Sequence, residues 1–433
     1  MRYLIFIILV ALVFIPASAS ARGAVIFVVD ALGSSYIAPN TATYASTGGA
    51  ISAVDIKSFD RAGARYQLKV PVPATEFGHA VIVTGYSNAS QETVADYHST
   101  VFDVLRDDGY LALGIMVNGD TPEMMGELDA IAHNSNESVM SPDYEFVENG
   151  HDVPQDIESM MRDHTHALQS AKSKDASRPY IVYNAWGIDF TRDLVDNMSR
   201  YHPDTNYVLI VNIGGLDSAG HNLGYSGYSA VLSGMDDDMG SLIDTCERSN
   251  TLLLITGDHG MSFKNATAKG AHQSADVAGR NESILTPLLI YSNESIPGGG
   301  TYGQECLAPT LLSLLDEPNT LSLCDGVPLP VKEKPTMFFW SESPAEVTVT
   351  GPGLNVSFKF NGTYRIPELK KGDYLVRHDG ISEAVSLGHD IVVDVRKDGQ
   401  SAQATPPWIA YGSAALASIG GIAIALKLAW ARK

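Results

Sequence analysis

The chain has 433 residues, of which 45% are hydrophobic, and its formal net charge is -21 at pH 7. This length allows one large domain with a smaller addition. The negative charge argues against nucleic acid as a partner, because binding to a phosphate backbone requires clustered Lys and Arg side chains.

The N-terminus has the pattern of a signal peptide. Arg2 precedes a long apolar run, which ends in the small residues of 17–21. A positive residue, an apolar run and a small-residue cleavage site together are typical of an export signal. We therefore predict a signal peptide over residues 1–21. A retained N-terminal anchor is the alternative.

Five short apolar runs predict buried strands of a parallel sheet. Helix-like segments lie between several of them, and the segment 228–246 has apolar residues three and four apart. Strands that alternate with helices favour a doubly wound, mostly parallel α/β sheet over residues 22–335, with ligand sites at the carboxyl ends of the strands. The runs are GAVIFVVDALG (23–33), YIVYNAW (180–186), NYVLIVNIGG (206–215), NTLLLITGDHG (250–260) and LTPLLIYS (285–292).

The segments outside these runs differ in composition. Residues 117–178 are polar and irregular, with charged helix-like sequence, and we interpret them as an insertion or cap over the site. Residues 336–397 alternate apolar and polar positions between Gly-rich turns, which predicts a small all-β, sandwich-like domain. Residues 398–407 form a short linker.

The C-terminus predicts one membrane-spanning helix over residues 408–426. This run of 19 residues carries no charge, and Lys427, Arg432 and Lys433 follow it. At a rise of about 1.5 Å per residue it would reach about 28 Å, which is enough for a bilayer core. Basic residues after a span belong in the cytoplasm. We therefore expect a single-pass membrane protein with a short cytoplasmic tail, 427–433, and its large domain outside the cytoplasm.

Glycosylation sequons and cysteines fit an exported chain. Cys306 and Cys324 are near enough in sequence to form a disulfide, which would leave Cys246 over and buried, although sequence does not fix connectivity. Eight Asn residues begin an Asn-X-Ser/Thr acceptor sequence. These are Asn88, Asn136, Asn197, Asn265, Asn281, Asn293, Asn355 and Asn361.

Asp and His residues gather at or just after the predicted strand ends. Each has an ordinary interpretation alone, since Asp after a strand often caps a helix and a lone His is usually not a ligand. Together, three carboxylates and three imidazoles are a mixed oxygen and nitrogen donor set that suits two divalent metals, Zn²⁺ or Mn²⁺. The set is Asp30, Asp217, His221, Asp258, His259 and His272.

A hydroxyl residue begins another helix-like run, PATEFGHAVIVTGYSN (73–88). Thr75 could cap this helix, because Thr accepts hydrogen bonds from the first-turn N–H groups. It could also be a nucleophile at a helix N-terminus, where backbone N–H groups favour a phosphoryl group. The other candidate residues favour the nucleophile.

The order Asp, hydroxyl, Asp-x-x-x-His, Asp-His, His resembles the signature of the alkaline-phosphatase superfamily of metalloenzymes. The resemblance spans about residues 24–330 and is tightest over 73–88 and 207–292. TEFGH is similar to the Ser-Glu-Val-Gly-His nucleophile segment of cofactor-independent phosphoglycerate mutases. A Thr nucleophile is more similar to the nucleotide pyrophosphatase/phosphodiesterase branch.

The resemblance implies a role for each residue. Thr75 would be the nucleophile and would form a phospho-threonine intermediate. It would also bind one metal ion with Asp30, Asp258 and His259, while a second ion would be held by Asp217, His221 and His272. His79 and three cations near the second set, Lys264, Lys269 and Arg280, are candidates for substrate binding, although the cations could equally be solvated loop charges.

The branches of this superfamily differ at the nucleophile. A sulfatase that matures Cys or Ser needs Cys/Ser-x-Pro-x-Arg, and TEFGH has none of its fixed residues. Phosphoglycerate mutase is a cytoplasmic activity, whereas this chain has an export pattern. The sequence thus favours a phosphomonoesterase or phosphodiesterase that acts on a phosphate ester. The alternatives are a phosphoglycerate mutase-like activity, a transferase acting on a surface glycan or lipid, and a non-catalytic cell-surface module. The oligomeric state is not predicted.

Overall fold

The computed structural model describes residues 23–38, 43–44, 50–117, 122–150, 153–167 and 175–395. The predicted signal peptide, the linker, the predicted membrane-spanning segment and the predicted cytoplasmic tail lie outside these residues. Within the part of the chain that is described, no helix is long and apolar enough to cross a bilayer.

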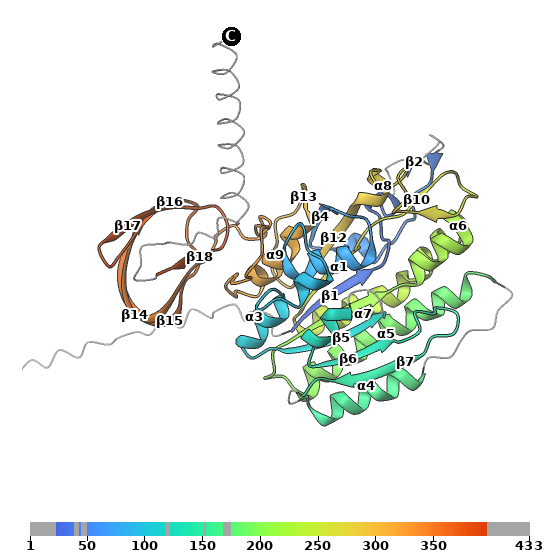
Figure 1. Cartoon of the computed structure of the whole chain (residues 1–433), viewed down its shortest axis with the longest axis horizontal. Helices are drawn as coiled ribbons and strands as arrows, with labels where there is room; N and C mark the ends of the chain where they lie inside the picture. Colours follow the sequence, from blue (N-terminus) through green and yellow to red (C-terminus); the bar gives the residue numbers. More distant parts are fainter. Residues whose placement is uncertain are drawn as a thin grey trace, which may run out of the picture.

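A nine-stranded, mostly parallel sheet forms the centre of the larger region (Figure 1). Strand β1 lies in its middle and pairs in parallel with β8 on one side and β9 on the other. In sheet order the strands are β13 (Thr301–Gly303), β4 (Ala64–Lys69), β12 (Leu285–Tyr291), β9 (Thr251–Thr256), β1 (Gly23–Val29), β8 (Tyr207–Ile213), β5 (Leu111–Val117), β6 (Ala130–Asn134) and β7 (Tyr144–Glu148).

Helices cover both faces of this sheet, and each face has its own hydrophobic core. Side chains of β1 alternate between the two cores, and every residue of the strand is buried. Burial on both faces explains why the central strands are continuous apolar runs. One face is covered by α4 (Gln155–Ala167), α5 (Arg178–Tyr201), α6 (Gly215–Gly234) and α7 (Asp236–Ser249). The other is covered by α1 (Thr75–Thr84), α2 (Gln91–Val94), α3 (Val101–Asp107) and α9 (Leu307–Leu314).

Smaller elements connect these layers. They are η1 (Ser34–Tyr36), β2 (Thr43–Tyr44) paired with β3 (Ala50–Ile51), η2 (Phe59–Arg61), η3 (Pro122–Glu127), β10 (Ser262–Phe263) paired with β11 (Gly270–Ala271), α8 (Asn281–Ile284) and η4 (Gln304–Cys306).

Two sequence predictions about this region are wrong. Residues 180–186, predicted as a strand, lie in α5. Pro179 stands in the first turn of that helix, and its buried residues recur three and four apart over 24 residues, which is a helical period. The described part of 117–178, predicted as an insertion or cap, instead extends the sheet with β6 and β7 and places α4 beside α5.

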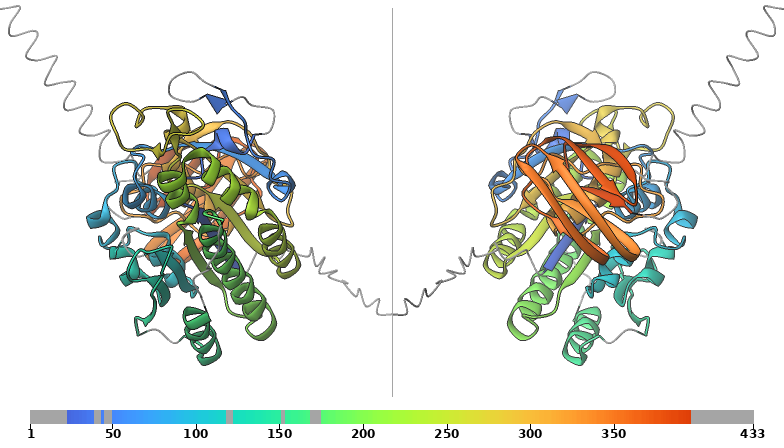
Figure 2. Two further views of the ribbon diagram at one scale, coloured as in Figure 1. Left: turned by 90° about the vertical axis from the view of Figure 1, so that its right-hand side faces the viewer. Right: turned by 90° about the vertical axis from the view of Figure 1, so that its left-hand side faces the viewer.

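A smaller, mostly antiparallel region follows (Figure 2). It has its own hydrophobic core. We call it the β domain. It consists of β14 (Met337–Gly351), β15 (Leu354–Ile366), β16 (Gly372–His378), β17 (Ile381–Leu387) and β18 (Ile391–Asp394). The strand order is β15–β14–β16–β17, and β18 pairs with the first half of β14.

A buried carboxylate joins the β domain to the larger region. Asp390 Oδ2 accepts hydrogen bonds from Ser313 Oγ and Lys332 Nζ, each at 2.8 Å, and Asp390 Oδ1 accepts one from Thr336 N at 2.6 Å. Ser313 belongs to α9, so these bonds tie the final helix of the larger region to the turn before β18.

Glu317 follows α9 near this junction. We expect its carboxyl group to make the stability of the fold depend on pH. Burial and the nearby charge of Asp108 raise its pKa to about 8. A carboxyl group with a raised folded-state pKa stabilises the fold below its unfolded pKa, and this stability is lost as pH rises through the folded value. Differential scanning calorimetry should therefore show Glu317→Gln melting above the native protein at about pH 9 and close to it at about pH 5. Glu333→Gln, at an exposed position, is the control. An equal change in melting temperature at both pH values would contradict the prediction.

The three cysteines, all within described residues, are free thiols, and Cys246 is fully buried. The predicted disulfide between Cys306 and Cys324 is therefore not formed in this structure. Cys324 Sγ instead donates a hydrogen bond to the Gly326 carbonyl oxygen at 3.4 Å, within its own turn.

Candidate metal centre

Three carboxylates lie at the carboxyl ends of the three central strands. Asp30 directly follows β1, Asp217 lies in the first turn of α6 just after β8, and Asp258 follows β9 by one residue. Because β8, β1 and β9 are adjacent and parallel, their carboxyl ends meet at one edge of the sheet.

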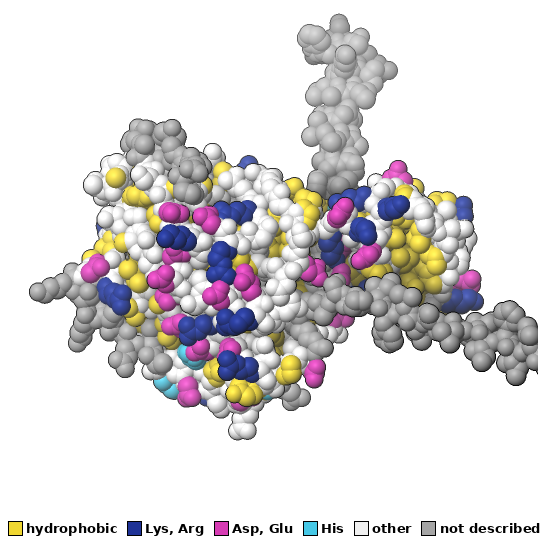
Figure 3. All heavy atoms as spheres, turned by 180° about the vertical axis from the view of Figure 1, so that it is seen from behind, with side chains coloured by type: hydrophobic (Ala, Val, Ile, Leu, Met, Phe, Trp, Pro, Cys, Tyr) yellow, Lys and Arg dark blue, Asp and Glu magenta, His cyan; other side chains and the backbone are white. Residues whose placement is uncertain are grey.

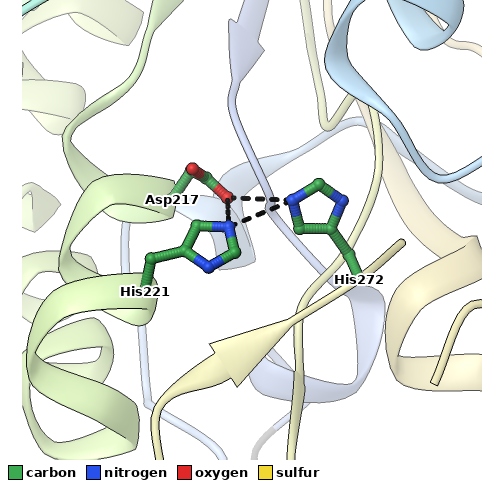
Figure 4. Close-up of side chains that lie close together, drawn as sticks. All are labelled: Asp217, His221 and His272. Atoms are coloured by element: carbon green, nitrogen blue, oxygen red, sulfur yellow. Dashed lines mark hydrogen bonds and ion pairs between the residues drawn. The ribbon is translucent and has the colours of Figure 1, made fainter. Parts of the chain in front are cut away.

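Asp217 and two histidines form a compact cluster (Figure 4). His221 is one helical turn after Asp217, and its Nε2 lies 3.2 Å from Asp217 Oδ1. His272 comes from the segment after β11, and its Nε2 lies 3.1 Å from His221 Nε2 and 3.6 Å from Asp217 Oδ1. The three donor atoms therefore face a common point.

A second cluster contains His259. Its Nε2 lies 3.5 Å from Asp30 Oδ1, 3.4 Å from Asp258 Oδ2 and 3.2 Å from Thr75 Oγ1. Donor atoms of Asp30, Asp217 and His259 all lie within 4.8 Å of one another. Asp217 thus belongs to both clusters, and the rings of His259 and His272 stack with centroids 3.8 Å apart.

Backbone carbonyls orient the three imidazoles in the same way. Each ring directs Nδ1 to a carbonyl oxygen, which can only accept a hydrogen bond, so Nδ1 carries the proton and Nε2 faces the cluster. An outer hydrogen bond of this kind is typical of metal-binding histidines. The pairs are His221 Nδ1 with Gly270 O at 3.1 Å, His259 Nδ1 with Gly260 O at 3.0 Å and His272 Nδ1 with Pro73 O at 2.7 Å.

Burial keeps the two inner imidazoles neutral. It lowers the pKa of both His259 and His272 to about 4, and for His272 the nearby ring of His259 adds to the effect. For His221 the hydrogen bond with Asp217 raises the pKa. Neutral imidazole is the form that binds metals.

The carboxylates fit a bound cation. Burial raises the pKa of Asp258, whose side chain is fully buried, and its Oδ2 accepts no hydrogen bond from any described residue. Burial opposes the ionisation of Asp217, but the hydrogen bond with His221 and the nearby histidines outweigh it and lower the pKa. Buried carboxylates without nearby Lys or Arg partners are costly unless a metal ion balances them. Carboxylate oxygen with neutral imidazole nitrogen suits Zn²⁺ or Mn²⁺.

Thr75 lies at the first position of α1, beside the second cluster. The N-cap residue is Ala74, which has no side chain that could cap the helix. The Thr75 hydroxyl is 3.2 Å from His259 Nε2 and partly exposed. The first-turn N–H groups of α1 are therefore not capped by the N-cap side chain, and the hydroxyl is directed at the donor cluster.

Several supporting residues have no signal in the sequence. Ala31 has a φ of 65°, which is rare for a residue with a Cβ, and its N–H donates a hydrogen bond to Asp258 Oδ1 at 3.1 Å. Tyr228 Oη donates to the Ala31 carbonyl at 2.8 Å. Buried Gln304 donates from Nε2 to the Asp258 carbonyl at 2.9 Å. These bonds hold the turn that presents Asp258.

Gly78 of α1 allows a close approach between the helix and the Asp258 turn. A Cβ atom at Gly78 would lie 2.4 Å from the Asp258 carbonyl oxygen, which is backbone and cannot rotate away. Gly78→Ala is therefore expected to separate Thr75 from Asp258 and to destabilise the fold by about 1–3 kcal/mol, the usual effect of overpacking. Chemical denaturation and metal titration would measure both effects. Ala80→Gly, on the same helix, is a control for helix propensity. A Gly78→Ala protein with native stability and metal affinity would contradict this packing.

The four predicted substrate-binding residues have different surroundings in the structure. His79 is fully buried, and its Nδ1 donates to the Thr75 carbonyl oxygen at 2.9 Å, so its ring is directed back at its own helix. Lys264 is exposed and lies 3.6 Å from Asp276 Oδ2, and Arg280 Nε donates to the Asp276 carbonyl oxygen. Lys269 is exposed and close enough to His221 for its charge to lower the pKa of that ring.

A family model described as the Metalloenzyme superfamily matches residues 187–277. The match includes five of the clustered residues, Asp217, His221, Asp258, His259 and His272. This part of the chain is thus similar to a metalloenzyme family, and its clustered donor atoms could hold metal ions.

Solved structures with similar folds include two that share little sequence with this chain. One is the lipoteichoic acid synthase LtaP from Listeria monocytogenes, with a TM-score of 0.47 and 10% identity over 74% of this chain and 78% of that chain. Another is an alkaline phosphatase from the Antarctic bacterium TAB5, with a TM-score of 0.43 and 13% identity over 69% of this chain and 99% of that chain. No curated protein matches the sequence.

Proposed function

We propose that this protein is an exported, membrane-anchored phosphoryl-transfer enzyme that hydrolyses phosphate monoesters or diesters with Thr75 as its nucleophile. The observation that carries the proposal is the position of the Thr75 hydroxyl. The hydroxyl lies at the N-terminus of α1, where the N-cap side chain makes no hydrogen bond to the helix. It is 3.2 Å from Nε2 of His259, a neutral, buried histidine beside the carboxylates.

The donor atoms divide into two sets around Asp217. Asp30, Asp258 and His259 with Thr75 would hold one divalent ion, and Asp217, His221 and His272 would hold the other. Bound ions would lower the pKa of the Thr75 hydroxyl and neutralise negative charge on the phosphoryl oxygens. The residues themselves fix the geometry, because each imidazole is oriented by a backbone carbonyl.

The chemistry of the chain's own groups then follows in two steps. The Thr75 oxygen attacks phosphorus as its proton passes to solvent, the bond from phosphorus to the leaving oxygen breaks, and the leaving group takes a proton from water. First-turn N–H groups of α1 are positioned to donate to the phosphoryl oxygens. Water then attacks phosphorus and loses a proton to solvent, the bond to the Thr75 oxygen breaks, and that oxygen takes up a proton. The product is phosphate from a monoester or a phosphate monoester from a diester.

Export and anchoring rest on the sequence of the two ends. The signal-peptide pattern over 1–21 and the uncharged run over 408–426 support an extracytoplasmic site held at a membrane. In that position an acceptor other than water, such as a surface glycan or lipid, would make the same phospho-threonine chemistry a transferase reaction.

Turnover of three aryl esters tests the proposal. The full chain in detergent, supplied with Zn²⁺ or Mn²⁺, would be assayed with an aryl phosphate monoester, an aryl phosphate diester and an aryl sulfate. We expect turnover of one of the phosphate esters that is lost on chelation. Turnover of the sulfate alone would overturn the phosphoryl assignment. Turnover of none, with metal bound, would favour a non-catalytic module.

A further inference from the structure

The β domain has an aromatic cluster where its long hairpin bends. Strands β14 and β15 change register between Ser341 and Ala345, and Gly362 of β15 has a φ of 80°. The bend brings residues of one strand together, so that the rings of Phe358 and Tyr364 stack with centroids 4.2 Å apart. The full cluster contains Phe339, Phe358, Phe360 and Tyr364.

The cluster is incompletely buried. Tyr364 is 37% exposed, and the apolar residues of β15 that alternate along one face are half-buried. Hydrophobic side chains form a continuous area on the β domain, with charged side chains of both signs around it (Figure 3). The other side of the strand is polar and exposed. The half-buried positions are Leu354, Val356, Phe358, Phe360 and Ile366, and the exposed positions between them are Asn355, Ser357, Lys359 and Asn361.

The described chain ends beside this cluster. Phe339 of β14 pairs with Tyr364 of β15 on one side and with Val393 of β18 on the other. Tyr364 and Val393 are therefore two strand spacings apart, about 10 Å. Twelve residues separate Val395, the last described residue, from Trp408, where the apolar run begins. Even fully extended, they would reach only about 40 Å.

We infer that the half-exposed aromatic face of the β domain lies against the surface of a lipid bilayer. The proposal rests on the anchoring proposed above but is independent of catalysis. Tyr, Phe and basic side chains are typical of the membrane interface, where apolar rings enter the headgroup region and cations meet anionic lipids. Lys370 and Lys371, shortly after β15, supply exposed positive charge in this part of the chain.

The two sequons on the polar side of β15 agree with this orientation. Asn355 and Asn361 are exposed and lie on the side opposite the apolar positions. A glycan is bulky and hydrophilic, so it would face solvent while the aromatic side faces lipid.

Depth-dependent fluorescence quenching tests the inference. The full chain with Cys324→Ser would carry Tyr364→Cys, labelled with an environment-sensitive fluorophore, in vesicles of phosphatidylcholine and phosphatidylglycerol. The matched control is Lys359→Cys, because its side chain is 78% exposed on the opposite side of the same strand. Lipids with a nitroxide near the headgroup should quench the label at position 364 at least about twofold more than the label at 359, as expected for an interfacial group.

Three outcomes of the labelling and flotation experiments would overturn the inference. Equal quenching at both positions, in protein that floats with the vesicles, would show that the anchor holds but the face is turned away. Energy transfer between labels at position 364 that rises with protein density, without lipid quenching, would show that a second copy covers the face. Failure to float would reject the anchor as well, whereas loss of aryl phosphate turnover would leave the inference intact.

Discussion

Replacing Thr75 with Ala is expected to lower kcat for the best phosphate ester by about 1,000-fold or more, because the substitution removes the attacking oxygen and the covalent route. The Thr75 side chain is partly exposed and is one of several donors in its cluster, so the fold and most of the bound metal should remain. Steady-state kinetics with elemental analysis of the same preparation would measure both quantities.

Thr75→Ser is the matched control for this prediction. It keeps a hydroxyl at the first position of α1 and should retain substantial turnover, and acid-quenched protein should contain a phosphorylated peptide that includes position 75. A Thr75→Ala protein with native kcat would reject the nucleophile, even if metal is bound.

Replacing Asp217 with Asn is expected to cause the largest loss of bound metal. Asp217 belongs to both donor clusters, and its Oδ1 lies 3.2 Å from His221 Nε2 and 3.6 Å from His272 Nε2. Loss of its charge should lower the affinity for both ions by at least about 100-fold. Even substitution of a residue that only hydrogen-bonds to a metal ligand lowers metal affinity about 10–100-fold.

Comparison with His221→Gln makes this prediction specific. His221 belongs to one cluster and its side chain is 39% exposed, so its loss should release one ion and leave the more buried set at Asp258 and His259 occupied. Asp237→Asn, at an exposed position of α7, controls for the change in charge. Titration with a competing chelator would measure each affinity. Equal losses in the Asp217 and His221 variants would contradict the shared role of Asp217.

The sequence predicted those features of the fold that depend on local pattern. The apolar runs ending near Asp30, Asp217 and Asp258 required strands buried on both faces, and the mostly parallel central sheet and separate antiparallel region are confirmed. The strand prediction for residues 180–186 is wrong, because the residue pattern of a short apolar segment in a buried helix does not distinguish it from a strand. The prediction that residues 117–178 form an insertion or cap is wrong, because the polar composition of an edge strand such as β7 resembles that of a loop.

The residues that hold the candidate site in place could not be predicted from the sequence. Gln304 is more than forty residues from Asp258 and contacts its backbone, so no local motif connects the two. The left-handed conformation of Ala31 depends on its hydrogen bonds to Asp258 and Tyr228, which come from two other segments. The sequence left open whether His79 contacts substrate or only packs, and the packing of α1 buries it. Such features depend on tertiary contacts rather than on residue type or spacing.

Metal content per chain tests the central claim most directly. The full chain would be purified without chelators, dialysed against limiting Zn²⁺ or Mn²⁺, and analysed for bound metal beside the Asp217→Asn variant. The account predicts two divalent ions per native chain, release of both on chelation with a fall in melting temperature, and few ions in the variant. A native chain that binds no stoichiometric metal, and melts at the same temperature with and without chelator, would contradict a metal centre at these residues.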